Sequence, residues 1–298
     1  MRIGIDVGGT KIEGIALGRT GETLIRERVS TPREHYSRTI GAIADLVDRI
    51  EREAGQQGTI GIGIPGTISR KSGLVKNANS TCLIGQPFDR DIARRLGRPV
   101  RIANDADCFA MSEARDGAAA GAHTVFGVIL GTGVGGGLIV GGALLDGPNG
   151  IVGEWGHNPM PDENDALAPP CYCGRSGCIE TYLSGPGLAH DHFGQTGERL
   201  PAQEIAEAGR NGNLAAIASL DRYAERLGRA LAGVINITDP EVIVLGGGLS
   251  NIPGLITKIA EPLARHVFSD SVETKILTPM HGDSSGVRGA AFLWPDDC

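Results

Sequence analysis

"RIGIDVGGTKIEGIALGRTGETL" (2–24) and "VFGVILGTGVGGGLIVGGALLDG" (125–147) decide the fold, because both have the same layout. Each contains an apolar strand, a turn of glycine and threonine, and a second apolar strand. A helical pattern and a strand ending in glycine follow each of them. These lie at 36–55 and 59–66, and then at 215–237 and 241–248. The repetition predicts two similar α/β domains facing one another, with a single large α/β domain as the alternative.

The domain boundary is expected within 116–124, a stretch of small residues that suits a hinge. The N-terminal domain then covers 1–118 and the C-terminal domain covers 119–283. The last helix, within 284–298, is expected to return to the N-terminal domain.

Length and composition restrict the class of protein. The 298 residues are 41% hydrophobic, enough for sizeable cores, and carry a net charge of −7. An acidic chain disfavours a nucleic-acid partner, because binding phosphates requires clustered lysine and arginine. No apolar run reaches the length of a membrane span, and a strand starting at residue 2 leaves no room for a signal peptide. We expect a cytoplasmic protein with no nucleic-acid or membrane partner.

The stretch "GIDVGGTK" (4–11) is a candidate phosphate-binding turn. Its glycines allow backbone amides to approach phosphate oxygens, and Thr10 and Lys11 add side-chain donors. Asp6 is too close to such phosphates to bind them directly, so its carboxylate suggests Mg²⁺, bound through water. An ordinary hairpin turn explains the same residues equally well.

"GTGVGG" (131–136) matches the dinucleotide fingerprint, but that motif requires a helix directly after the glycines. Here "GGLIVGG" continues as a strand, and the chain contains no Walker A motif. Phosphates would therefore be held by the hairpin turns of both domains, while the loop at 246–248 would accommodate the adenosine. The candidate nucleotide-binding residues are Gly4, Asp6, Gly8, Gly9, Thr10, Lys11, Gly131, Thr132, Gly133, Gly135, Gly136, Gly137, Gly247 and Gly248.

Three of the six cysteines lie in "CYCGRSGC" (171–178). Neighbouring side chains of a C-x-C pair diverge, which disfavours a disulfide, and the motif is not the C-x-x-C of redox proteins. His157 upstream completes the pattern H-x13-C-x-C-x4-C. A Cys3His set is a closed tetrahedral zinc site, and closed sites are structural.

"PVRIANDADCFAMSEA" (99–114) places Asn104 and Asp105 between a strand and a helix. Asp105 is a candidate general base, with Asn104 beside it to orient a bound hydroxyl. Helix capping is the alternative for both. Glu154 and Glu180 flank the zinc pattern, so a zinc ion joining His157 to the cysteines would fix these carboxylates relative to one another. Ordinary surface charge is the alternative.

The motifs "DVGGTK", "GIGIPG", "NDADCFA", "GTGVGGG", "GEWGH" and "CYCGRSGCIET" together resemble the ROK family of repressors and sugar kinases, over almost the whole chain. The resemblance implies the α/β, actin-like (ribonuclease H-like) duplicated two-domain sugar kinase fold, ATP and Mg²⁺ as cofactors, and often a homodimer. It also implies that Asp105 is the catalytic base and that a Zn²⁺ knuckle spans 157–178. The implied zinc ligands are His157, Cys171, Cys173 and Cys178, and the implied sugar contacts are Asn79, Asn104, Asp105, Glu154, His157 and Glu180.

The hexose expected from the sequence is fructose, and also mannose, phosphorylated at the 6-hydroxyl. Segments 76–88, 154–161 and 281–294 look most like bacterial fructokinases, although the loop between His157 and Cys171 looks short for them. An N-acetylglucosamine or glucose kinase is the alternative. A repressor is disfavoured by the acidic charge and by a phosphate hairpin that begins at residue 2. A silent sugar-binding protein is disfavoured because the hairpin residues and Asp105 are all present.

Overall fold

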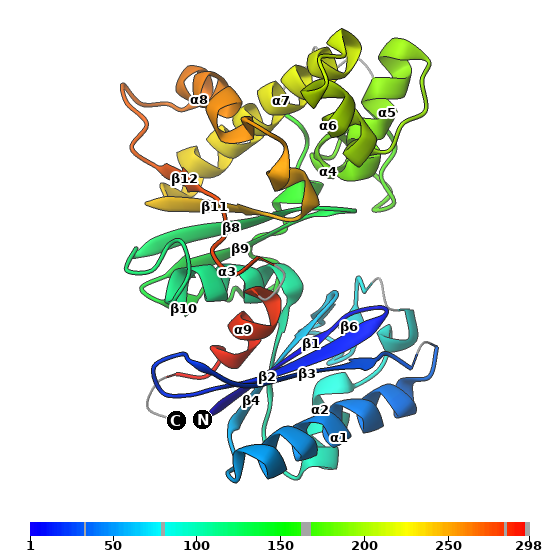
Figure 1. Ribbon diagram of the computed structural model, residues 1–298, viewed down its shortest axis with the longest axis vertical. Helices are drawn as coiled ribbons and strands as arrows, with labels where there is room; N and C mark the ends of the chain where they lie inside the picture. The colour runs from blue at the N-terminus through cyan, green and yellow to red at the C-terminus, as the bar shows by residue number, and fades with distance from the viewer. Residues whose placement is uncertain (33, 79–80, 162–167, 283–284, 296–298) are drawn as a thin grey trace. The chain divides into compact units, whose positions relative to one another are not determined.

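The computed structural model describes residues 1–32, 34–78, 81–161, 168–282 and 285–295 (Figure 1). Two five-stranded sheets have equivalent strand orders, β3-β2-β1-β4-β7 and β10-β9-β8-β11-β12. The predicted duplication and the α/β class are therefore confirmed. The strands of these sheets are β1 (Arg2–Val7), β2 (Lys11–Leu17), β3 (Thr23–Ser30), β4 (Thr59–Ile64), β7 (Arg101–Asn104), β8 (Thr124–Leu130), β9 (Val134–Val140), β10 (Ala143–Leu144), β11 (Val242–Gly246) and β12 (Lys275–Leu277).

Contacts within the chain group the residues into two compact units. Unit 1 comprises Met1–Gly121, Gly137–Val152 and Pro279–Cys298, and unit 2 comprises Ala122–Gly136 and Gly153–Thr278. The division expected from the sequence does not assign Gly137–Val152 to the first unit. The physical reason is the missing side chain of Gly137, where a Cβ would lie 2.9 Å from the Ala106 carbonyl oxygen.

In unit 1 the sheet is covered by a helix on each face (Figure 1). Helix α1 (Tyr36–Ala54) packs on one face, where Leu46 and Ile50 lie against Gly14. Helix α9 (Ser285–Ala291) packs on the other face and approaches so closely that a Cβ on Gly4 would lie 2.0 Å from the Val287 carbonyl oxygen. Gly4 of β1 therefore allows the last helix to lie directly on the sheet. The other elements of unit 1 are β5 (Thr67–Ile68), β6 (Val75–Lys76), α2 (Phe88–Leu96) and α3 (Asp105–Arg115), with a 3₁₀ turn at Thr81–Leu83.

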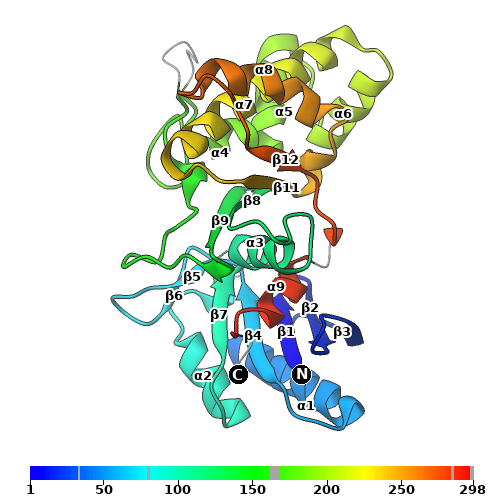
Figure 2. The same ribbon diagram turned by 90° about the vertical axis from the view of Figure 1, so that its left-hand side faces the viewer.

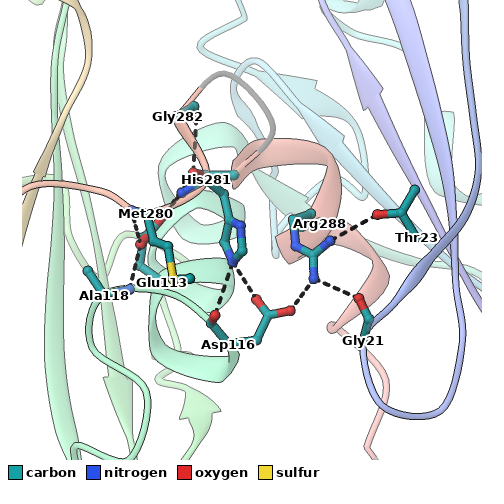
Figure 3. Close-up of polar contacts among 10 residues, drawn as sticks. Gly21, Thr23, Glu113, Asp116, Ala118, Met280, His281, Gly282 and Arg288 are labelled. Atoms are coloured by element: carbon teal, nitrogen blue, oxygen red, sulfur yellow. Dashed lines mark hydrogen bonds and ion pairs between the residues drawn. The ribbon is translucent and has the colours of Figure 1, made fainter.

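Glu113, near the end of α3, fastens the C-terminal segment to that helix (Figure 3). Its carboxylate is fully buried and accepts hydrogen bonds from the backbone amides of Ala118, Met280 and His281 and from the Ser285 hydroxyl. A buried carboxylate is stable only when such donors surround it. The segment that leads into α9 is thus fixed to the helix that begins at Asp105.

A second carboxylate, Asp116, extends this network to the β2–β3 turn. It accepts a hydrogen bond from Arg288, whose guanidinium also donates to the Gly21 carbonyl oxygen at 2.8 Å and to the Thr23 hydroxyl at 3.3 Å (Figure 3). His281 Nε2 lies 2.9 Å from Asp116 Oδ1. The polar network therefore connects α3, α9 and the first sheet.

In unit 2 the helices α7 and α8 lie on the same side of strands β11 and β12 (Figure 2). They pack closely at Gly228, where a Cβ would lie 2.5 Å from Pro262 Cβ. No helix in the described ranges is both long and apolar enough to cross a membrane. The helices of unit 2 are α4 (Glu180–Leu183), α5 (Gly185–Thr196), α6 (Ala202–Arg210), α7 (Leu214–Thr238) and α8 (Leu255–His266), with 3₁₀ turns at Trp155–His157 and Gly248–Asn251.

Candidate active site and metal centre

The first candidate phosphate turn connects β1 to β2 in unit 1. The Gly8 amide donates to the Lys11 carbonyl oxygen at 3.0 Å, and the Thr31 hydroxyl donates to the Gly8 carbonyl oxygen at 2.7 Å. These bonds close the turn. The amides of Gly9 and Thr10 are exposed and make no hydrogen bond within the described ranges. They are the donors of this turn that an anion could use.

Two acidic groups in unit 1 have perturbed pKa values. Burial, followed by the charges of Asp105 and Glu13, raises the pKa of Asp6 to about 6. Desolvation also raises the pKa of Asp105, although part of its side chain remains open to solvent. Burial and neighbouring negative charges make the ionised form of these carboxyl groups unfavourable, and a bound cation would offset that cost. Carboxylate oxygens are ligands that Mg²⁺ prefers. The residues around Asp6 therefore fit a magnesium ion.

Asn104 and Asp105 occupy the junction of β7 and α3. Asn104 is the N-cap of α3, since its Oδ1 accepts from the Asp107 amide at 2.6 Å. Its amide Nδ2 has no hydrogen-bond partner in the described part of the chain. Asp105 Oδ1 accepts from the adjacent Ala106 amide at 2.9 Å. Capping thus explains one atom of Asn104, and Asn104 also lines a cavity of about 740 Å³ within unit 1.

The second candidate phosphate turn connects β8 to β9 in unit 2, and it is bonded to a carboxylate. The Gly131 amide donates to the Gly133 carbonyl oxygen at 2.9 Å. The next amide, of Val134, donates to Glu180 Oε2 at 2.9 Å. The third glycine loop lies beside this turn, because a Cβ on Gly247 would lie 2.3 Å from the Leu130 carbonyl oxygen. Three predicted features of the C-terminal half are therefore brought together.

Four of the candidate nucleotide glycines lie inside strands, and three of them face a closely packed neighbour. Gly4 faces α9, and Gly137 faces α3. Gly136 faces Trp155, where a Cβ would lie 3.0 Å from the indole ring. The Gly135 carbonyl oxygen accepts from the same indole N–H at 3.0 Å. These neighbours explain why Gly4, Gly136 and Gly137 lack a side chain. A phosphate contact for any of the four remains a prediction.

His157, Cys171, Cys173 and Cys178 come together in unit 2, with their candidate ligand atoms all within 4.8 Å of one another. Cys171 Sγ lies 3.6 Å from His157 Nδ1, and Cys173 Sγ lies 3.6 Å from Cys178 Sγ. Tetrahedral ligands around one zinc ion lie about 3.5–3.8 Å apart, given the usual zinc–ligand bond lengths. The donor set and its spacing therefore fit zinc.

The knuckle backbone is held by tight turns and short bridges. Gly174 and Gly177 have φ of +87° and +71°, values that favour glycine. The Cys171 amide donates to the Arg175 carbonyl oxygen at 2.8 Å, and the Met160 amide donates to the Gly177 carbonyl oxygen at 2.8 Å. These backbone bonds place the three cysteines beside His157.

The thiols differ in pKa. A hydrogen bond from the Arg175 backbone lowers the pKa of Cys173 to about 6, whereas desolvation raises the pKa of Cys178 to about 12. Zinc binds the thiolate form, so binding would displace the proton of Cys178.

Tyr172 is a neighbour of the metal ligands that the sequence analysis does not select. Its hydroxyl oxygen lies 2.9 Å from His157 Nε2, and the two rings meet edge to face. Partial desolvation and then the charges of Glu180, Cys171 and Glu154 raise the pKa of Tyr172 to about 12. The negative charges of both candidate sugar carboxylates, Glu154 and Glu180, therefore contribute to the raised pKa of this phenol. An aromatic residue between two metal ligands is the sequence signal for it.

The remaining predicted residues have simple placements. Glu154 precedes the 3₁₀ turn Trp155–His157, and Glu180 is the first residue of α4. Asn79 and most of the short loop, 162–167, lie outside the described residues. Roles for these side chains remain predictions.

Comparisons with known proteins define the class and then the family. The chain superposes on the ROK hexokinase of Thermus thermophilus with a TM-score of 0.89 at 31% identity, covering 98% of this chain and 97% of the other. A ROK family glucokinase from Streptomyces griseus, solved with glucose and AMPPNP, gives a TM-score of 0.78 at 30% identity, covering 98% of each chain. The fold is therefore the actin-like, duplicated one expected from the sequence.

The family follows from the sequence itself. The ROK family profile matches residues 2–297. The chain is 43% identical to an N-acetyl-D-glucosamine kinase of Yersinia pseudotuberculosis over 98% of each chain. It is 40% identical to the enzyme of that name from Photobacterium profundum, over 98% of this chain and 99% of the relative. The chain belongs to the ROK family.

Proposed function

We propose that the protein is an ATP-dependent hexose kinase whose preferred acceptor is N-acetylglucosamine, phosphorylated at its 6-hydroxyl. The observation that carries the acceptor is the 40–43% identity, over nearly full length, to relatives named N-acetyl-D-glucosamine kinase. These relatives favour the alternative derived from the sequence over its main expectation, fructose. Glucose is the second candidate, because a similar structure is a glucokinase solved with glucose.

Asp105 is the proposed catalytic base. A hydroxyl that attacks a γ-phosphate loses its proton, and a carboxylate with a raised pKa accepts that proton readily once it is ionised. The raised pKa of Asp105 and its place at the start of α3 support this role. Asn104 keeps its Oδ1 in the helix cap and offers its Nδ2 to a sugar hydroxyl.

The other sugar contacts are proposed to come from Asn79 and from Glu154, His157 and Glu180. Carboxylates and an imidazole N–H match the donors and acceptors of vicinal hydroxyls. The bond between Glu180 and the Val134 amide supports a fixed position for that carboxylate. Recognition of the sugar would therefore depend on residues beside the knuckle.

ATP phosphates are proposed to bind the exposed amides of Gly9 and Thr10, with Lys11, and the turn Gly131–Gly133. The adenosine would lie near Gly247 and Gly248. Mg²⁺ would be held near Asp6, where it would neutralise phosphate charge. Zn²⁺ would be held by His157, Cys171, Cys173 and Cys178, where it would fix the backbone that carries the sugar contacts. Pairing of two chains remains a prediction.

A coupled ADP-release assay with fructose, mannose, glucose and N-acetylglucosamine tests this proposal. We expect the highest kcat/KM for N-acetylglucosamine. Without sugar, the wild-type protein should release no more ADP than the Asp105→Asn protein does. A higher kcat/KM for fructose or mannose would show the acceptor to be wrong. No sugar-dependent ADP release with any of the four would show the kinase assignment to be wrong.

A further inference from the structure

Tyr172 has a side chain whose position is not explained by packing. The residue is 81% exposed, although its neighbours Cys171 and Cys173 both belong to the candidate metal cluster. Large aromatic side chains are usually covered when they stabilise a fold. Its hydroxyl makes a hydrogen bond with His157 Nε2 at 2.9 Å, which is its one hydrogen bond in the described ranges. The side chain is therefore fixed by the hydrogen bond of its hydroxyl and not by packing of its ring.

The imidazole of His157 has only one edge to offer a substrate. Its Nδ1 faces the thiols, at 3.6 Å from Cys171 Sγ. A histidine that binds a metal through Nδ1 carries its proton on Nε2, so Nε2 donates. The Tyr172 oxygen then accepts this hydrogen bond. A sugar hydroxyl oxygen is the same kind of acceptor, and the two would compete for a single N–H.

We propose that Tyr172 is a placeholder at the sugar site: its phenol occupies His157 Nε2 in the sugar-free protein and is replaced there by a substrate hydroxyl. This inference rests on the proposed function, since it takes a hexose as the competing ligand. Tyr172 thereby weakens sugar binding and keeps the imidazole hydrogen-bonded between turnovers.

The knuckle lowers the free-energy cost of exchanging the phenol for a sugar hydroxyl. Cys171 and Cys173 fix the backbone on both sides of Tyr172, so only its side-chain torsions need to change. An exposed ring loses few packing contacts when it turns away. Glu154 precedes His157 by three residues and Glu180 follows Cys178 by two, so a sugar bound by these carboxylates would lie beside the same knuckle. The exchange would thus occur where the substrate is recognised.

The variant Tyr172→Phe keeps the ring and removes the competing oxygen. Removing a competitor of ordinary hydrogen-bond strength should lower both the KM and the Kd for N-acetylglucosamine by about two- to tenfold, with kcat unchanged. Tyr36→Phe is the matched control, since that hydroxyl donates to Asp91 in unit 1, and it should leave both constants unchanged. Zinc content is measured for every protein, because loss of metal would change sugar binding by another route.

Calorimetric sugar titration without ATP separates this inference from the proposed function. If the wild-type protein binds the sugar and Tyr172→Phe binds it no more tightly, the placeholder role is wrong while the function stands. If Tyr172→Phe binds more weakly, the phenol is a direct sugar contact and the placeholder role is again wrong. If the wild-type protein binds none of the four hexoses, the proposed function fails first. Tyr172→Ala should bind at least as tightly as wild type under the placeholder role.

Discussion

The two hairpins of the duplicated scaffold share a backbone and differ in where their charges come from. The β1–β2 turn follows Asp6 by two residues, and the β8–β9 turn follows Ile129 by the same interval. Lys11 and Glu13 add charge to the first hairpin, whereas the equivalent positions of the second hold Val134 and Gly136. The first hairpin therefore carries its own carboxylate.

The second hairpin receives a carboxylate from elsewhere in its unit. Glu180 reaches its turn from α4 and accepts the Val134 amide. Since Glu180 follows Cys178 by two residues, the metal knuckle and the phosphate turn share one contact. The turn is thus common to both copies, whereas the carboxylate belongs to β1 in unit 1 and to the first residue of α4, next to the candidate metal ligands, in unit 2. Under the proposed function, unit 1 would supply the base, the cation site and the asparagine contacts, and unit 2 would supply the sugar contacts beside the knuckle.

The largest expected effect tests the chemistry assigned to unit 1. Asp105→Asn removes the proposed base and should lower kcat by about 10²- to 10⁴-fold, because general-base catalysis contributes that much. The Kd for sugar should change little, since other residues make most sugar contacts. Asp107→Asn, also in the first turn of α3, is the matched control and should keep near-normal kcat. Near-normal turnover by Asp105→Asn would reject the assignment.

The next effect tests the metal assigned to unit 2. Chelation of zinc, or Cys173→Ser, should lower the melting temperature by about 10 °C and weaken sugar binding, because a structural zinc site contributes several kcal/mol. Metal analysis and a thermal melt measure both. Cys82→Ser, outside the knuckle, should keep zinc and melt within a few degrees of wild type. A native protein that contains no zinc would contradict the site.

The sequence predicts those features whose signal is local. The strand–turn–strand repeats, the helix start at Asn104–Asp105 and the cysteine spacing each lie within a few residues, and the structure has the corresponding elements. Contacts between distant segments have no such signal. Glu113 appears as an ordinary helix residue, yet its partners include Met280 and His281.

The glycines are the candidate residues whose roles the sequence distinguishes least. A glycine beside a phosphate and a glycine under a helix look alike in sequence, so Gly4 and Gly137 are grouped with the turn, although each faces a helix. Distinguishing them requires the neighbour that a Cβ would meet. The signal for Tyr172 is weak for a similar reason: an aromatic residue stands between two cysteines, but the hydrogen bonds of an exposed ring follow no periodic pattern.

The pH dependence of protein stability tests the difference between Asp6 in the first hairpin and Ile129, its counterpart in the second. Burial and nearby charge raise the pKa of Asp6 from 3.8 to about 6 in the folded state. The folded protein therefore favours the neutral acid, and its stability falls as pH rises from about 4 to about 6. Asp6→Asn stays neutral, so in metal-free protein it should be more stable than wild type above pH 6, by up to about 3 kcal/mol.

The advantage of Asp6→Asn should vanish below about pH 4, where both side chains are neutral. Urea unfolding in EDTA at several pH values measures it, and kcat should fall because the magnesium ligand is lost. Ile129→Val is the control, with a small stability loss that does not vary with pH. An Asp6→Asn protein less stable than wild type at pH 8 would show that the carboxylate is stabilised in the fold.

The smallest effect tests the bond between turn and knuckle in unit 2. A Cβ on Gly133 would lie 2.8 Å from Glu180 Oε2, at the flexible end of that side chain. Gly133→Ala should therefore displace the carboxylate from the Val134 amide and raise the KM for sugar roughly tenfold, the effect of losing a hydrogen bond to a charged group. Stability should change little, because a side-chain tip can move without disturbing the backbone. Gly233→Ala, where a Cβ meets nothing within 4 Å, is the control and should leave KM unchanged. If Gly133→Ala alters the KM for ATP but not for sugar, Glu180 orders only the turn. The assignment of sugar contacts to Glu180 would then be wrong.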